Sequence, residues 1–94
     1  MNATKVRALR DRLGLDRGTF ARLCGVDVRS VYRWESGEVE PQGVSLALLL
    51  AIHDQIKVPS AHAERVVRFL ADTARMGGFA LVVSRLLDRL DAKR

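Results

Sequence analysis

The side chains best suited to recognition chemistry lie in the segment VDVRSVYRWESG, which contains two arginines four residues apart. If this segment is helical, Val31 and Trp34 turn toward the interior and leave the opposite face to solvent. That outer face then carries Val28, Arg29, Tyr32 and Arg33. Arginine presents a planar fork of donors that matches two acceptors at once, such as phosphate oxygens or the O6 and N7 atoms of guanine.

Residues for catalysis or metal binding do not occur at useful spacings. His53 and His62 are separated by a proline, with no cysteine or carboxylate at ligand spacing, so we expect structural roles for both. Cys24 is the single cysteine, and we expect it to be a small buried hydrophobe. Gly77-Gly78 alone is no phosphate loop, and no serine lies in a nucleophile elbow. The sequence therefore predicts no enzyme, no metal and no cofactor, and no small-molecule ligand is evident.

The composition is that of an ordinary globular protein with a basic surplus. The 94 residues, 48% hydrophobic and 29% charged, fit one domain with an appended element and exclude wholesale disorder. The net charge of +5 permits nucleic acid as a partner and argues against a strongly cationic substrate. Residues 1–35 hold eight basic and four acidic side chains, so this first part has a surplus of four.

Membrane and export features are not expected. The first residues run directly into a charged amphipathic pattern, without the apolar core of a signal peptide. The most apolar run, residues 44–52, is well short of the roughly 20 residues that span a bilayer. A lone cysteine fits a reducing compartment. We therefore predict a cytoplasmic protein with no membrane partner.

Helical periodicity runs through the whole chain, so the predicted fold class is all-α. The first three helices are expected to end at Gly14, Gly25 and Gly37, and the second and third to begin after the N-caps Asp16 and Asp27. A fourth helix, residues 44–53, is apolar enough to be buried on most sides. Two parts emerge: a compact four-helix unit over residues 1–57, and a C-terminal helical hairpin over residues 60–94.

Residues 15–41, LDRGTFARLCGVDVRSVYRWESGEVEP, resemble the helix-turn-helix of the Xre/Cro-like phage-repressor family. The family pattern, counted from Arg17, is matched by Ala21, Gly25, Val31 and Trp34 and by the ending Trp34-Glu35-x-Gly37. A small residue such as Ala21 allows two helices to cross closely, and Gly25 permits the sharp reversal between them. The resemblance covers about the first 57 residues and implies a DNA-binding domain.

The resemblance also implies which residues contact DNA. It assigns the outer face of the third helix to the major groove, so the base-contacting residues would be Val28, Arg29, Tyr32 and Arg33. For Tyr32, a contact to a phosphate or stacking on a sugar is the alternative. Arg17 and Thr19 lie in the first turn of the second helix, where the helix dipole favours a phosphate. Arg22 is either a further phosphate contact or a solvated charge. Because the loop after the third helix carries Glu38 and Glu40, we expect its phosphate contacts to reduce to backbone amides and Gln42.

Two further roles follow at the edges of this motif. The family commonly pairs an arginine of the first helix with the glutamate of the W-E-x-G ending, which implies a structural pair of Arg10 with Glu35. Asp27 is expected to cap the third helix, and an additional bond to a cytosine amino group is the alternative.

The C-terminal hairpin leaves two arrangements open. Its last part carries an apolar stripe that would form a homodimer interface: Phe79, Val82, Val83, Leu86, Leu87 and Leu90. A dimer would set two recognition helices about 34 Å apart, one turn of DNA. Alternatively, the hairpin folds back onto the helices of its own chain.

The function predicted from these features is that of a homodimeric repressor, bacterial or phage-encoded and nucleoid-associated, which binds a palindromic operator in double-stranded DNA. The alternative is an antitoxin-like interaction module whose hairpin binds a partner protein. An amphipathic membrane-surface role for the last helix is a weaker alternative, because Asp88 and Asp91 accompany its arginines.

Overall fold

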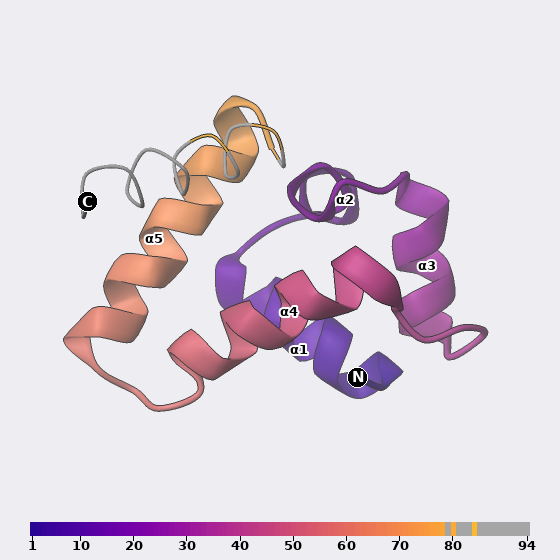
Figure 1. Ribbon diagram of the computed structural model, residues 1–94, viewed down its shortest axis with the longest axis horizontal. Coiled ribbons are helices and arrows are strands. Elements are labelled where there is room, and N and C mark those ends of the chain that lie inside the picture. The colour runs from indigo at the N-terminus through magenta and orange to yellow at the C-terminus, as the bar shows by residue number, and fades with distance from the viewer. Residues whose placement is uncertain (79, 81–83, 85–94) are drawn as a thin grey trace.

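A computed structural model of the chain describes residues 1–78, 80 and 84, and these residues form five α-helices and no strand (Figure 1). The helices are α1 (Ala3–Leu13), α2 (Arg17–Cys24), α3 (Val28–Ser36), α4 (Gly43–Ile56) and α5 (Ala61–Met76). The predicted all-α helix-turn-helix bundle is confirmed.

Local capping fixes where most of these helices begin and end. Four of them begin after a side chain that accepts a hydrogen bond from a backbone amide of the first turn, at 2.8 to 3.0 Å. The capping residues are Asn2, Asp16, Asp27 and Ser60. Gly25 ends α2 in the left-handed conformation, with φ of 72°, which a residue without Cβ adopts at little cost. The reversal between α2 and α3 therefore follows directly from the sequence.

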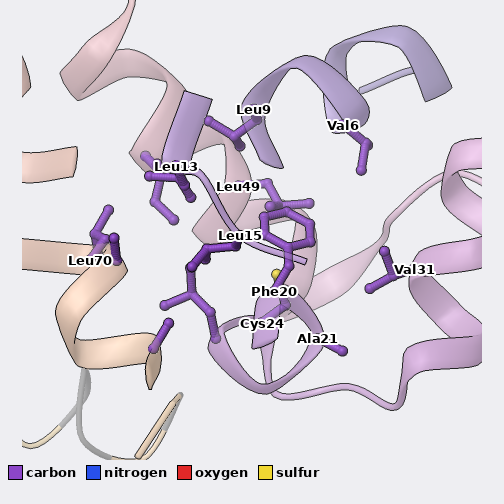
Figure 2. Close-up of a cluster of buried hydrophobic side chains, with 14 of the residues drawn as sticks. Val6, Leu9, Leu13, Leu15, Phe20, Ala21, Cys24, Val31, Leu49 and Leu70 are labelled. Carbon is purple, nitrogen blue, oxygen red and sulfur yellow. The ribbon is translucent and has the colours of Figure 1, made fainter. Parts of the chain in front are cut away.

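One hydrophobic core joins all five helices. Figure 2 shows its side chains converging from α1 through α5, with Phe20 and Leu49 among the fully buried ones. The helix α5 packs against α1, α2 and α4 of its own chain and supplies Ala63, Leu70, Ala71 and Ala74 to this core. Figure 1 shows α5 and α3 on opposite sides of the molecule.

The C-terminal end of α5 and the residues after it contact the α1–α2 connection and α2. Arg75 Nη2 donates to the carbonyl oxygen of Gly14 at 3.3 Å. Gly78 is buried with φ of 71°, and a Cβ there would lie only 2.8 Å from the carbonyl oxygen of Arg22. Only glycine fits this approach without displacing the backbone. The six apolar residues of the predicted dimer interface, Phe79, Val82, Val83, Leu86, Leu87 and Leu90, lie outside the described residues.

The prediction that the fourth helix is buried on most sides is wrong. The helix α4 is longer than expected and buries Leu49, Ile52 and Ile56, whereas Val44 and Leu50 are 71% and 48% exposed. The neighbours of α4 include α5 and α2, and they leave Val44 and Leu50 in contact with solvent. An apolar sequence does not reveal on how many sides a helix has neighbours.

Candidate nucleic-acid interface

The pair α2 and α3 forms a tight unit around a few small and apolar side chains. Ala21 is 2% exposed where the two helices contact each other, and its carbonyl oxygen accepts from the Val26 amide at 3.0 Å. Val31 and Trp34 of α3 are also buried, so α3 is held through one face. In the part of the chain that the structure describes, the opposite face of α3 is exposed.

That exposed face carries the residues expected to contact bases. Val28 is 39% exposed, Tyr32 is 54% exposed and Arg29 is exposed. Arg33 is exposed as well, and its Nε lies 3.9 Å from a carboxylate oxygen of Glu38, an ion pair of two solvated side chains. Such exposed pairs contribute little, so the Arg33 fork can exchange this partner for another acceptor. The face therefore presents two arginine forks beside an aromatic ring.

Asp27 stands at the start of this face and has a structural role. Its Oδ1 accepts from the Ser30 amide at 3.0 Å and caps α3. This bond satisfies the Ser30 amide, one of the first-turn amides of α3 that the helix itself leaves without a full partner.

The residues expected to hold phosphates differ in their burial and in the hydrogen bonds that they already make within the protein. Thr19 is 9% exposed, its amide donates to Asp16 Oδ1 at 2.8 Å, and its hydroxyl accepts from Arg22 Nη2 at 3.3 Å. The Thr19 amide bond is also the main reason why the pKa of Asp16 is lowered. Gln42, exposed at the start of α4, makes no capping bond. The side chains of Arg22 and Gln42 are thus better placed than Thr19 to reach a ligand.

Arg17 connects α2 to α3 through two contacts. Its guanidinium lies over the Tyr32 ring, 4.8 Å from the centroid, and its Nε donates to Glu35 Oε1 at 3.2 Å. The Arg17 side chain nevertheless remains 39% exposed. Sequence reasoning placed Arg17 and Tyr32 in separate roles and missed the stacking between them.

Glu35 is the centre of a buried cluster that includes the pair proposed from the family resemblance. Arg10 Nε donates to Oε2 at 2.7 Å and Arg10 Nη2 donates to Oε1 at 3.0 Å, with Glu35 only 4% exposed. Arg10 Nη1 also donates to the carbonyl oxygen of Leu15, so α1, α3 and the α1–α2 connection meet here. The structure places Arg10 and Glu35 in a bidentate ion pair.

The charges of this cluster shift the ionisation of both partners. Burial by itself raises the pKa of Glu35, but the hydrogen bonds and charges of Arg10 and Arg17 outweigh burial and leave the pKa lowered. The hydrogen bond to Glu35 is the main reason why the pKa of Arg10 is raised. Both groups are therefore charged at neutral pH.

Arg7 is a member of this cluster that sequence reasoning missed. Its Nη2 donates to the backbone carbonyl of Glu35 at 2.7 Å, and its Nε lies 4.0 Å from Glu35 Oε1. The residue is on α1, outside the helix-turn-helix motif, and only its spacing of three from Arg10 hinted at a shared face.

Other reactive groups do not gather at this surface. Cys24 is buried, and burial raises the pKa of its thiol to about 12. Within the described residues, no three histidine, cysteine or carboxylate side chains come together as they would to hold a metal ion. The described helices also include none with the length and apolarity needed to cross a membrane.

Comparison with known proteins identifies one match. A protein-family model described as helix-turn-helix matches residues 6–58, which is more than half of the chain. No curated protein and no solved structure matches the chain.

Proposed function

Because this chain belongs to the Xre/Cro-like helix-turn-helix family of DNA-binding regulators, we propose that it is a homodimeric repressor that binds a palindromic operator. The family assignment predicted from residues 15–41 is confirmed, and the matched segment extends to nearly the same residue as the expected domain.

The observation that carries the proposal is the exposed face of α3. Two arginine forks, Arg29 and Arg33, share this face with Val28 and Tyr32, and the rest of α3 is anchored in the core. In the major groove these forks would bind guanine through O6 and N7, while Val28 would lie against a thymine methyl group. The charge surplus of residues 1–35 favours the same partner.

Repression would follow from occupancy of the operator. We place the dimer interface in the apolar stripe of residues 79–90, which would bring two copies of α3 to successive turns of the major groove, about 34 Å apart. A regulator of this kind needs no cofactor and catalyses no reaction, and it works in the cytoplasm, where the DNA is.

The experiment that tests this proposal is selection of bound sequences from a random DNA library, followed by salt titration of the best site. We expect a palindromic motif containing guanine and, if about eight phosphates per dimer are neutralised, a slope of log affinity against log salt near −7. A flat salt dependence without an enriched motif would refute DNA binding. Sedimentation at micromolar concentration tests the dimer separately, because a strict monomer contradicts only that part.

Single-residue variants then test the assignment of the face. Arg33→Ala should lose discrimination at one guanine position, at about 1–3 kcal/mol. Arg68→Ala is the matched control, because Arg68 is an exposed arginine on α5, the helix that Figure 1 shows on the opposite side of the molecule from α3. An Arg33→Ala variant that keeps the wild-type base preference would show that this side chain contacts no base.

A further inference from the structure

Two arginines from different helices converge on one oxygen of Glu35 at the edge of the exposed α3 face. Arg17 Nε donates to Oε1 at 3.2 Å, and Arg7 Nε lies 4.0 Å from the same atom. The two guanidiniums are therefore neighbours, although α1 and α2 bring them from positions ten residues apart. Tyr32, which belongs to the α3 face, lies beneath Arg17.

Glu35 cannot neutralise this group of cations. Its Oε2 is occupied by Arg10, its Oε1 is shared by Arg10 and Arg17, and the whole residue is 4% exposed. One carboxylate thus faces three guanidiniums. Arg10 is 13% exposed and is the buried partner, whereas Arg7 and Arg17 are 52% and 39% exposed. The unneutralised charge is at the surface, on Arg7 and Arg17.

Both exposed guanidiniums are held in place before any ligand arrives. Arg17 uses its Nε for Glu35, and its guanidinium lies over the Tyr32 ring. Arg7 is anchored through its Nη2 on the Glu35 carbonyl oxygen. Among the described residues, each therefore retains at least one terminal nitrogen that no protein oxygen accepts from. Side chains already fixed by the fold lose less entropy on binding.

We propose that Arg7 and Arg17 form a two-arginine clamp for one phosphate of the DNA backbone, with Tyr32 acting as a positioning residue for Arg17. A phosphodiester is the anion that fits, because paired guanidinium forks match its oxygens and because the clamp borders the α3 face. This inference rests on the proposed DNA binding. It adds Arg7 to the interface and changes the role of Tyr32 from a base contact to a support.

The salt dependence of binding to the selected operator tests the clamp. Arg7→Gln and Arg17→Gln should each make the slope of log affinity against log salt shallower by about 0.9 per chain, without changing the ranking of operator variants. Arg7→Lys, which keeps the charge, should keep the slope. Arg68→Gln removes the same charge from an exposed position on α5 and should leave the slope unchanged. Thermal unfolding of each variant verifies that it is folded.

The role of Tyr32 is tested in two backgrounds. Tyr32→Phe keeps the ring and should bind like the wild type. Tyr32→Leu removes the stacking surface and should weaken binding about two- to five-fold. In the Arg17→Gln background the same change should have no further effect, because the side chain that Tyr32 supports is gone.

The results that would overturn the clamp are distinct from those that would refute DNA binding. If the wild type selects an operator but Arg7→Gln keeps the slope of Arg68→Gln, Arg7 binds no phosphate and the clamp is wrong. If Tyr32→Leu alters the base preference in the Arg17→Gln background, Tyr32 contacts a base and is not merely a support for Arg17. If the wild type itself enriches no motif and shows no salt dependence, the proposed function and the clamp both fail.

Discussion

Removal of the Glu35 carboxylate should destabilise the protein far more than removal of an ordinary surface charge. Glu35 is 4% exposed and accepts three side-chain hydrogen bonds, two from Arg10 and one from Arg17. In Glu35→Ala the 13% exposed Arg10 loses both of its side-chain hydrogen bonds to a carboxylate and keeps only the exposed Asp11, whose Oδ1 lies 4.0 Å from Arg10 Nη1. Such broken buried pairs cost about 3–5 kcal/mol, a large share of the roughly 5–15 kcal/mol that stabilises a typical domain.

The structure also predicts an asymmetry between the two partners. When Arg10 is replaced by alanine, Glu35 keeps Arg17 at 3.2 Å and Arg7 at 4.0 Å, so its charge is still compensated. When Glu35 is replaced, Arg10 keeps only the exposed Asp11 at 4.0 Å and no hydrogen bond to a carboxylate. We therefore expect Arg10→Ala to cost less than Glu35→Ala, and the double variant to cost less than the sum by about 0.5–3 kcal/mol.

Urea denaturation measures these differences, and the buried Trp34 next to Glu35 provides a fluorescence probe alongside far-UV circular dichroism. Midpoints are comparable only if the m-value is unchanged. Asp54→Ala is the control, because its ion pair with Lys57 joins two exposed side chains and should be worth at most about 1 kcal/mol. Additive single-variant effects, or a Glu35→Ala cost similar to that of Asp54→Ala, would refute the reasoning about the buried cluster.

Three further predictions concern stability and reactivity. The folded-state pKa of Glu35 lies below its unfolded value, so the Glu35 charge contributes fully to the free energy of unfolding above the unfolded pKa. This contribution is lost as the pH falls through the folded-state pKa. Urea midpoints of the wild type should therefore drop more steeply below about pH 5 than those of Glu35→Gln. Gly78→Ala should cost more than Gly37→Ala in thermal unfolding, because both have positive φ but only Gly78 would place a Cβ 2.8 Å from the Arg22 carbonyl oxygen; equal costs would contradict the close approach. Cys24, buried with a thiol pKa of about 12, should react with an alkylating reagent far more slowly in the folded than in the urea-unfolded protein, as mass spectrometry would show.

Features that depend on neighbouring residues along the chain could be predicted from the sequence. The caps Asp16 and Asp27 each bind an amide three residues ahead, and Gly25 reverses the chain within its own turn. These interactions close within one helical turn, so residue type and spacing are enough to predict them. The core of the helix-turn-helix could be predicted as well, because the spacing of its small and apolar residues follows from the fixed crossing of two short helices.

Features that depend on which helices become neighbours could not be predicted in this way. The sequence of α4 is apolar on several sides, so its periodicity does not say that Leu49 is buried while Val44 and Leu50 are exposed. Similarly, Arg7 reaches Glu35 only because α1 crosses the end of α3. Contacts between residues far apart in sequence require the packing of the elements to be known first.

The Glu35 cluster explains how stability and binding can be separated in this domain. Arg10 and Arg17 share the carboxylate, but Arg10 is 13% and Arg17 is 39% exposed. Loss of Arg17 leaves both oxygens of Glu35 bonded to Arg10, so the buried charge stays compensated. Substitution of Arg17 should therefore weaken phosphate binding at little cost in folding, whereas substitution of Arg10 acts first on the fold. An arginine of this cluster can therefore bind a phosphate without a cost in stability only if Glu35 stays paired when that arginine leaves it.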